Sequence, residues 1–375
     1  MSTIHYILHD LIEVVVDERV SAGIINAVEF QLDYFKKTNE HLNSLCRVII
    51  VPYDDFVPND KQNFCCLDFL SGISGRCLDD AGNRAAVEKK NGNFYIYTDQ
   101  KYLPINLFIQ LILIEHDISL LSAAAVADSG EQVTLFPGAG GAGKSALTIR
   151  MVKDFNYRLL GDDTVCLNKQ GLCLSFPRKF HIKDYDRPHY DNLLQSIAHK
   201  KKRKKDSSAQ TAALRLAKCI RDNSPFLGLL NFLFNHASRK DLQKKYIPVF
   251  KYNDLNNRME VPISEIVGPE NISREGNLER VVYLQRYKGS DFLISKIDKE
   301  SLIRRTLATS QNEWALQMRL FCQMGSLEIL DLPGYFERVA EILRNGFKKK
   351  DANLLLIPEK ASPQELVDFY FRWLT

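Results

Sequence analysis

Residues 138–145 of this 375-residue chain read GAGGAGKS, and this stretch constrains the fold and the chemistry more than any other. It satisfies the phosphate-binding pattern G-x-x-x-x-G-K-[ST] at every fixed position. The apolar residues 133–136 predict a buried strand before it, and residues 146–149 predict the start of a helix after it. Such a turn presents backbone N–H groups to an anion at the positive end of the helix. The sequence therefore predicts a phosphate-binding loop, and a chance glycine-rich turn is the weaker interpretation.

Two side chains complete the predicted nucleotide site. Lys144 is expected to reach the β- and γ-phosphates, and the Ser145 hydroxyl can ligate Mg²⁺. The loop backbone would close around the phosphate oxygens. The expected binding residues are Gly138, Ala139, Gly140, Gly141, Ala142, Gly143, Lys144 and Ser145.

A pair of carboxylates follows the predicted loop and helix. Residues 157–161 predict a short strand, and this strand ends in Asp162 and Asp163. Folds with a phosphate loop place a metal ligand or a base at such a position beside the γ-phosphate. A turn or a helix cap is the alternative role for the pair. Their distance behind the loop favours the chemical role.

Composition narrows the class of protein. The chain is 45% hydrophobic with a net charge of +4, so it predicts a globular protein and does not demand a nucleic-acid surface. The longest apolar stretch, residues 105–114, contains Gln110 and is too short to cross a bilayer. Acidic residues occupy the start of the chain where a signal peptide carries bases. The eight cysteines include no C-x-x-C pair, so we expect reduced thiols and a cytoplasmic protein that does not act at a membrane.

Two regions are predicted, both of the α/β class. Residues 1–102 form the first, with strands at 12–16 and 47–52, a helix at 27–34 and a hairpin at Asn91-Gly92. His5 and His9 in this region have a metal-binding spacing if they lie on a helix, but ordinary histidines are the favoured interpretation.

Residues 103–375 form the second predicted region, which contains the phosphate loop. A strand is expected at residues 120–126, and an insertion is expected at about residues 186–260. The insertion carries the basic run at residues 200–205, for which a solvated loop is favoured over a patch that binds nucleic acid or an acidic partner. Later elements are predicted as a strand at 279–284, helices at 301–307, 312–321 and 335–347, a strand at 352–357 and a capped helix from Ser362 to Trp373.

These motifs carry a family resemblance. A small-residue strand, a second strand, GAGGAGKS, a helix and then YRLLGDD resemble the C-terminal domain of bacterial HPr kinase/phosphorylase. Members of that family are serine kinases with a fold like that of phosphoenolpyruvate carboxykinase. A chain with its own N-terminal module and a basic insertion is more similar to the related kinases that modify ribosomal peptides, such as lasso-peptide tailoring kinases. The resemblance is specific over residues 120–174 and diffuse elsewhere.

The resemblance implies a function and roles for individual residues. It implies an ATP- and Mg²⁺-dependent P-loop kinase that phosphorylates a serine hydroxyl of a peptide or protein substrate. Asp162 would be the base for the acceptor hydroxyl and a ligand of Mg²⁺ together with Ser145, while Asp163 would support catalysis. The bifunctional members have a histidine where this chain has Ser122, so we expect phosphorylation without phosphorolysis.

Some roles stay open at the level of sequence. The acidic motif downstream of the aspartates has no clear match, and Glu265 or Glu279 could be a second metal ligand. The cation that neutralises the transferred phosphoryl group could be any of Arg178, Lys179, Arg304 and Arg305. The phosphoryl donor, the acceptor and the oligomeric state, a homo-oligomer included, are not fixed.

Two other functions compete with a kinase. Residues 331–334 have the D-x-x-G form of a GTPase switch, but they lie far from the phosphate loop, and residues 168–171 lack a guanine-reading aspartate. A nucleotide-binding interaction protein that has lost catalysis is the other alternative, and Ser122 together with the missing acidic motif supports it.

Overall fold

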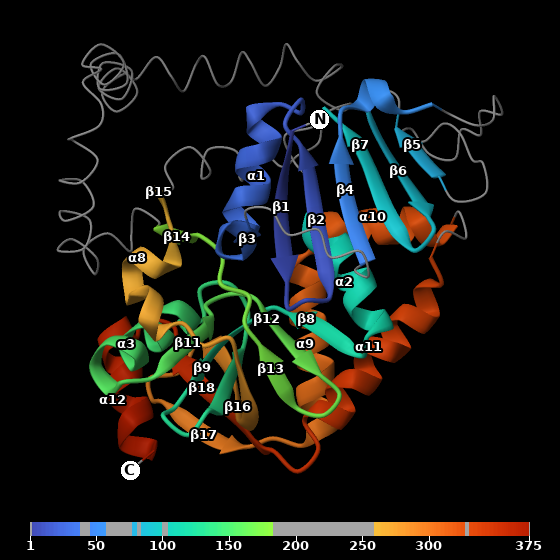
Figure 1. Cartoon of the computed structure of the whole chain (residues 1–375). Coiled ribbons are helices and arrows are strands. Elements are labelled where there is room, and N and C mark those ends of the chain that lie inside the picture. Colours follow the sequence, from blue (N-terminus) through green and yellow to red (C-terminus); the bar gives the residue numbers. More distant parts are fainter. Residues whose placement is uncertain are drawn as a thin grey trace, which may run out of the picture. The chain divides into compact units, whose positions relative to one another are not determined.

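The computed structural model describes residues 2–37, 46–57, 77–80, 84–99, 104–182, 259–326 and 330–374. Within these ranges the chain has a mixed α/β fold, as expected (Figure 1). One compact unit comprises Met1–Phe180 and Pro262–Thr375, and a second comprises His181–Val261. The predicted insertion, with its basic run, lies outside the described residues except for residues 259 and 260.

A mixed sheet is built from the first hundred residues. Its strands in the described part of the chain follow the order β3-β1-β2-β4-β7-β6-β5, with β2, β4 and β7 parallel. These strands are β1 (Thr3–Leu8), β2 (Ile12–Asp17), β3 (Lys36–Lys37), β4 (Cys46–Val51), β5 (Cys77–Asp80), β6 (Ala85–Lys90) and β7 (Asn93–Thr98).

A tight turn of two residues joins two neighbouring strands of this first sheet. The predicted hairpin is confirmed: Asn91 and Gly92 both have positive φ, 52° and 80°, and join β6 to the antiparallel β7.

The helix α1 spans Ala22–Leu32 and therefore begins five residues before its predicted start. Short 3₁₀ turns follow at η1 (Asp33–Phe35) and η2 (Tyr53–Asp55).

The second sheet is formed by later segments of the chain. Its described strands follow the order β11-β9-β10-β16-β13-β12-β8, with β18 pairing with both β16 and β17. The strands are β8 (Ile118–Leu121), β9 (Ala123–Ala127), β10 (Gln132–Pro137), β11 (Arg158–Gly161), β12 (Val165–Asn168), β13 (Leu172–Leu174), β16 (Glu275–Tyr287), β17 (Leu293–Lys296) and β18 (Asp351–Pro358). A separate pair consists of β14 (Phe180–Ile182) and β15 (Met259–Val261).

The single strand expected at residues 120–126 is wrong, because two strands occupy this stretch. The backbone N–H of Ser122 donates to Ser310 Oγ at 3.2 Å instead of to a neighbouring strand. Before this residue the chain pairs with β12 as β8, and after it the chain pairs with β10 and β11 as β9. The uniformly apolar sequence hides the break because both strands are buried.

Helices pack on the second sheet. α3 (Lys144–Phe155) contacts β9 and β11 and is covered by α12 (Pro363–Leu374), while α11 (Leu332–Gly346) contacts β8 and β12. Other helices in the described part of the second region are α8 (Ile263–Val267), η5 (Pro269–Asn271), α9 (Lys299–Glu313) and α10 (Ala315–Ser326). The predicted capping box begins α12, since the Ser362 N–H donates to Glu365 Oε2 at 2.7 Å and the Glu365 N–H donates to Ser362 Oγ at 3.2 Å.

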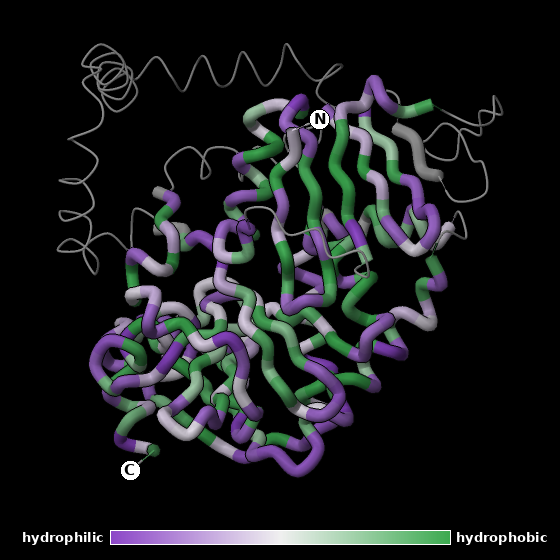
Figure 2. Tube along the Cα trace, in the orientation of Figure 1, coloured by the Kyte–Doolittle hydropathy of each residue, from purple (hydrophilic) through white to green (hydrophobic). Residues whose placement is uncertain are grey.

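The helix α2 (Ile105–Glu115) connects the cores of the two sheets. It is buried along nearly its whole length and contacts β4 of the first sheet and β8 of the second. Its Gln110 Oε1 accepts the Leu120 N–H at 2.6 Å, which satisfies a polar side chain in an apolar helix. Figure 2 shows hydrophobic residues concentrated along the strands. None of the described helices is long and apolar enough to span a membrane.

Candidate functional site

The predicted phosphate loop lies between β10 and α3, so its context is the expected strand, loop and helix. Gly141 and Gly143 have positive φ, 82° and 106°, which side-chain-bearing residues adopt at a cost. At Gly138 a Cβ atom would lie 2.6 Å from the carbonyl oxygen of Leu284 on β16. These glycines are therefore required by the turn and by its close approach to the neighbouring strand. The crest of the loop, from Ala139 to Gly141, is exposed.

Lys144 begins α3 and folds back over the loop. Its side chain is 4% exposed, and Nζ donates to the carbonyl oxygens of Gly138 at 2.5 Å and Ala139 at 3.1 Å. The same Nζ lies 3.9 Å from Asp163 Oδ1. Burial lowers the pKa of Lys144, and the negative charge of Asp163 opposes that change. The lysine thus joins the predicted loop to the predicted carboxylate pair.

Asp162 and Asp163 follow β11 and have different environments. Asp162 is 5% exposed, and its Oδ1 has no hydrogen-bond partner among the described residues. Burial, followed by the negative charge of Asp163, raises the pKa of Asp162 to about 7. Asp163 is half-exposed and forms an ion pair with the Arg178 guanidinium. The pair therefore combines a buried carboxyl group that titrates near neutrality with a carboxyl group that is paired with a guanidinium.

Arg178 is the one member of the four candidate cations that the described contacts bring to this site. It reaches Asp163 from the segment after β13, which is fixed by the hydrogen bond from the Phe176 N–H to Leu160 O at 2.9 Å. By contrast, Arg305 Nη1 donates to Gln285 Oε1 at 2.6 Å. Arg304 bonds to Ser301 on its own helix. The sequence could not distinguish these basic residues, because only the contacts of their side chains in the folded chain show which one lies at the site.

Glu313, the last residue of α9, is a site residue that sequence analysis missed. Its Oε1 accepts the backbone N–H of Gly140 at 2.7 Å, so a carboxylate oxygen occupies one donor of the phosphate loop. Its negative charge also acts on Lys144. The loop and Glu313 are separated by more than 170 residues and no motif surrounds Glu313, so the sequence offered no signal for this contact.

Arg286, near the end of β16, is a second residue that sequence analysis missed. Its Nη2 lies 4.0 Å from the position of a Cβ on Gly143. Its Nη1 donates to the carbonyl oxygens of Pro358 and Ala361, both at 2.8 Å, which fixes the connection that leads into α12. A guanidinium held in this way adds positive charge beside the start of α3.

Other residues that the sequence analysis singled out do not contact the phosphate loop among the described residues. Glu265 on α8 and Glu279 on β16 are both exposed, and no contact with the loop is found for either among the described residues. Asp331 of the D-x-x-G sequence is the N-cap of α11, where its side chain accepts the Gly334 N–H at 3.1 Å. His5 lies on strand β1 and bonds to Glu13, so the two N-terminal histidines do not share a helix.

The acidic side chains of the site fit Mg²⁺ bound together with nucleotide phosphates better than a metal ion held by protein ligands alone. In the part of the chain that the structure describes, no cluster of three or more histidine, cysteine, aspartate or glutamate side chains could hold a metal ion. Mg²⁺ in nucleotide sites, however, is commonly bound by one or two protein oxygens together with phosphate oxygens and water. The unpartnered oxygen of Asp162 fits that second arrangement.

Comparison with known proteins does not assign this chain to a family. No protein-family model matches the chain, and no curated protein matches it.

Proposed function

We propose that this protein is an ATP- and Mg²⁺-dependent kinase with a P-loop kinase core, which transfers the γ-phosphoryl group to a serine hydroxyl of a peptide or protein. The observation that carries the proposal is the buried carboxyl group of Asp162, with one unpartnered oxygen and a pKa of about 7, in the same site as the phosphate loop. A protein that only binds nucleotide has no need for such a group, whereas proton transfer at neutral pH does.

The phosphates would bind at the loop. Backbone N–H groups at its exposed crest and the N-terminus of α3 face the anion, and Lys144 would exchange its loop carbonyl contacts for β- and γ-phosphate oxygens. Mg²⁺, held by Ser145 and Asp162, would neutralise charge on those phosphates. Arg178, kept close by Asp163, is the cation positioned to stabilise charge on the transferred group.

Asp162 would act on the acceptor. A serine hydroxyl is a weak nucleophile, so a carboxylate must orient it and accept its proton. As the serine oxygen bonds to the γ-phosphorus, the bond from that phosphorus to the β-phosphate bridging oxygen breaks and the proton passes to Asp162. ADP leaves with the electron pair of the broken bond.

Lys144→Ala tests the nucleotide site. We expect loss of measurable binding of a fluorescent ATP analogue with Mg²⁺, because the cation that contacts the β- and γ-phosphates is removed. Lys153→Ala is the matched control, since Lys153 is an exposed lysine in the last turn of the same helix. Circular dichroism spectra of both variants, compared with wild type, check that each variant is folded. Nucleotide affinity equal to that of wild type in Lys144→Ala would refute the phosphate-loop assignment.

A further inference from the structure

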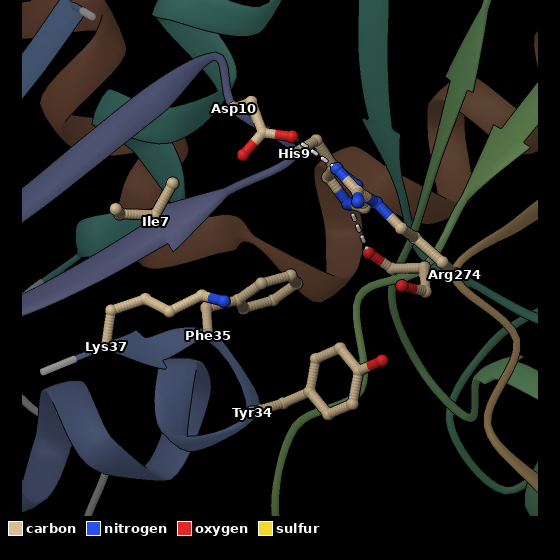
Figure 3. Close-up of a pocket in the computed structure, with 8 residues that line it drawn as sticks. Ile7, His9, Asp10, Tyr34, Phe35, Lys37 and Arg274 are labelled. Carbon is tan, nitrogen blue, oxygen red and sulfur yellow. Dashed lines mark hydrogen bonds and ion pairs between the residues drawn. The ribbon is translucent and has the colours of Figure 1, made fainter. Parts of the chain in front are cut away.

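A cavity of about 180 Å³ lies away from the phosphate loop, between the first β-hairpin and the segment that precedes β16 (Figure 3). Its floor is formed by buried residues that include Ile7, Phe35 and Ser175, and its rim carries exposed charged side chains. The volume is below that of sites for drug-sized ligands, so the cavity suits one small group and not a whole nucleotide.

The charges of the rim favour an anion. Lys37 and Arg274 are on opposite sides of Phe35 in Figure 3, and they contribute two positive charges. Asp10 contributes the one negative charge and is already paired with Arg274. Among the described residues no ion pair of Lys37 is found. The described lining therefore has one cation in excess, and that cation is Lys37.

His9 adds no charge to the cavity. Its Nε2–H donates to the carbonyl oxygen of Ser175 at 2.7 Å, and its ring packs edge-on against Phe35 with centroids 5.5 Å apart. Burial, and then the nearby Arg274 charge, lowers the pKa of His9, so the imidazole is neutral at physiological pH. The His9 ring therefore lines the cavity and holds the β1–β2 hairpin against Ser175 and Phe35.

The turn of the first hairpin and one buried hydroxyl group shape the cavity. His9 and Asp10 both have positive φ, 52° and 58°, because they are the central residues of the tight turn that joins β1 to β2, in which the Leu11 N–H donates to Leu8 O at 2.9 Å. This conformation places His9 against Ser175 and Asp10 against Arg274. The Ser175 side chain is fully buried, and its hydroxyl has no hydrogen-bond partner among the described residues. A buried hydroxyl group without a hydrogen-bond partner in a cavity wall is available to a ligand that enters the cavity.

We infer that this cavity is a binding site for a small oxyanion, a phosphate or a carboxylate group, with Lys37 as its main contact. Arg274 contributes its remaining N–H donors, and Tyr34 and Phe35 provide an apolar wall for the part of the ligand that carries the anion. The group could belong to an acidic or phosphorylated side chain of a peptide or to a small free anion, and the chemistry of recognition is the same. The inference does not depend on nucleotide binding at the loop.

Calorimetric titration tests this inference. The parent protein is the full chain with Lys144→Ala, which weakens competing phosphate binding at the loop. The probes are inorganic phosphate, N-acetyl-phosphoserine methylamide and N-acetyl-aspartate methylamide. We expect Lys37→Gln to weaken the tightest-binding probe by about tenfold or more, as for a lost charge-assisted hydrogen bond. Lys36→Gln is the control, because this neighbouring lysine bonds to Glu29 and does not line the cavity.

The probes also separate the sources of the anion. Tighter binding of either amino-acid amide than of inorganic phosphate would assign the site to a peptide side chain, phosphorylated or acidic according to the probe. Inorganic phosphate binding at least as tightly as both amides would assign it to a small free anion. The inference is overturned if no probe binds the parent protein, or if Lys37→Gln and Lys36→Gln bind the probes equally well.

Discussion

At the scale of single residues, the ionisation of Asp162 would make the proposed phosphoryl transfer depend on pH. With a pKa of about 7, its carboxyl group is half ionised at neutral pH and becomes a competent base as the pH rises. The single-turnover phosphorylation rate of the wild-type protein should therefore increase through pH 7 and reach a plateau above it. Asp162→Asn retains the size of the side chain and removes the base, so this rate should fall by about 10²-fold or more.

The same substitution separates two roles of Asp162. Loss of rate with unchanged affinity for ATP·Mg²⁺ would identify the carboxylate as the base. A parallel loss of metal-dependent affinity would identify it chiefly as a ligand. Asp163→Asn is the comparison and should cost less rate, because Asp163 is paired with Arg178. Rates near those of wild type in both variants would place the catalytic carboxylate elsewhere.

Asp162 should also make the fold sensitive to pH. Its pKa is about 7 in the fold against an ordinary value of 3.8, so the folded chain binds an extra proton between these values. The free energy of unfolding must then fall as the pH rises from about 4 to about 7, by on the order of 4 kcal/mol for this group. Asp162→Asn cannot ionise, so in denaturant titrations its stability should exceed that of wild type at pH 8 and not at pH 4.

Residue patterns selected the candidate residues that are close in sequence, and the structure brings these residues together. The loop, Lys144 and the aspartates lie within 26 residues, and their spacing alone identified them. Glu313 and Arg286 could not be found in this way, because each reaches the loop from a distant segment and neither lies in a recognisable motif. Choosing Arg178 among four basic residues likewise required the contact with Asp163.

At the scale of elements, the end of α9 contacts the predicted phosphate loop. Glu313 accepts the Gly140 N–H that a phosphate oxygen would need, and its charge would repel the phosphates of the proposed nucleotide. Glu313→Gln should tighten binding of ATP·Mg²⁺ by about two- to fivefold, the range expected for one exposed charge. Glu300→Gln, in the first turn of the same helix and paired with Arg344, should leave the affinity unchanged. Weaker binding in Glu313→Gln would show instead that the carboxylate assists the nucleotide or its metal.

Elements were predictable where side-chain pattern and backbone chemistry agree. The Asn91-Gly92 hairpin and the capping box of α12 are confirmed, since each depends on a few adjacent residues. The split between β8 and β9 was not predicted, because the strands that pair on either side of Ser122, and the Ser310 hydroxyl that accepts its N–H, come from later parts of the chain. Uniform burial also removes the polar positions that would otherwise mark a strand end.

At the scale of the whole molecule, the two main sheets share a core within one compact unit. The connection is α2, whose buried side chains belong to the same hydrophobic cluster as residues of both sheets. Sequence analysis predicted residues 1–102 as a module distinct from the phosphate-loop region. The continuous core instead predicts that the two sheets unfold together, as a single cooperative unit.

Phe108→Ala tests this cooperativity. Phe108 on α2 is 1% exposed, and its ring centroid lies 5.3 Å from that of Phe94 in the first sheet. Truncation should cost about 3–5 kcal/mol of unfolding free energy. Hydrogen exchange measured by mass spectrometry along a denaturant series should show β2 and β4 losing protection at the same lowered midpoint as β9 and β10. Leu293→Ala, at a side chain 51% exposed, is the control and should shift neither sheet. Loss of protection confined to the first sheet would show that residues 1–102 unfold independently and that α2 does not couple the two cores.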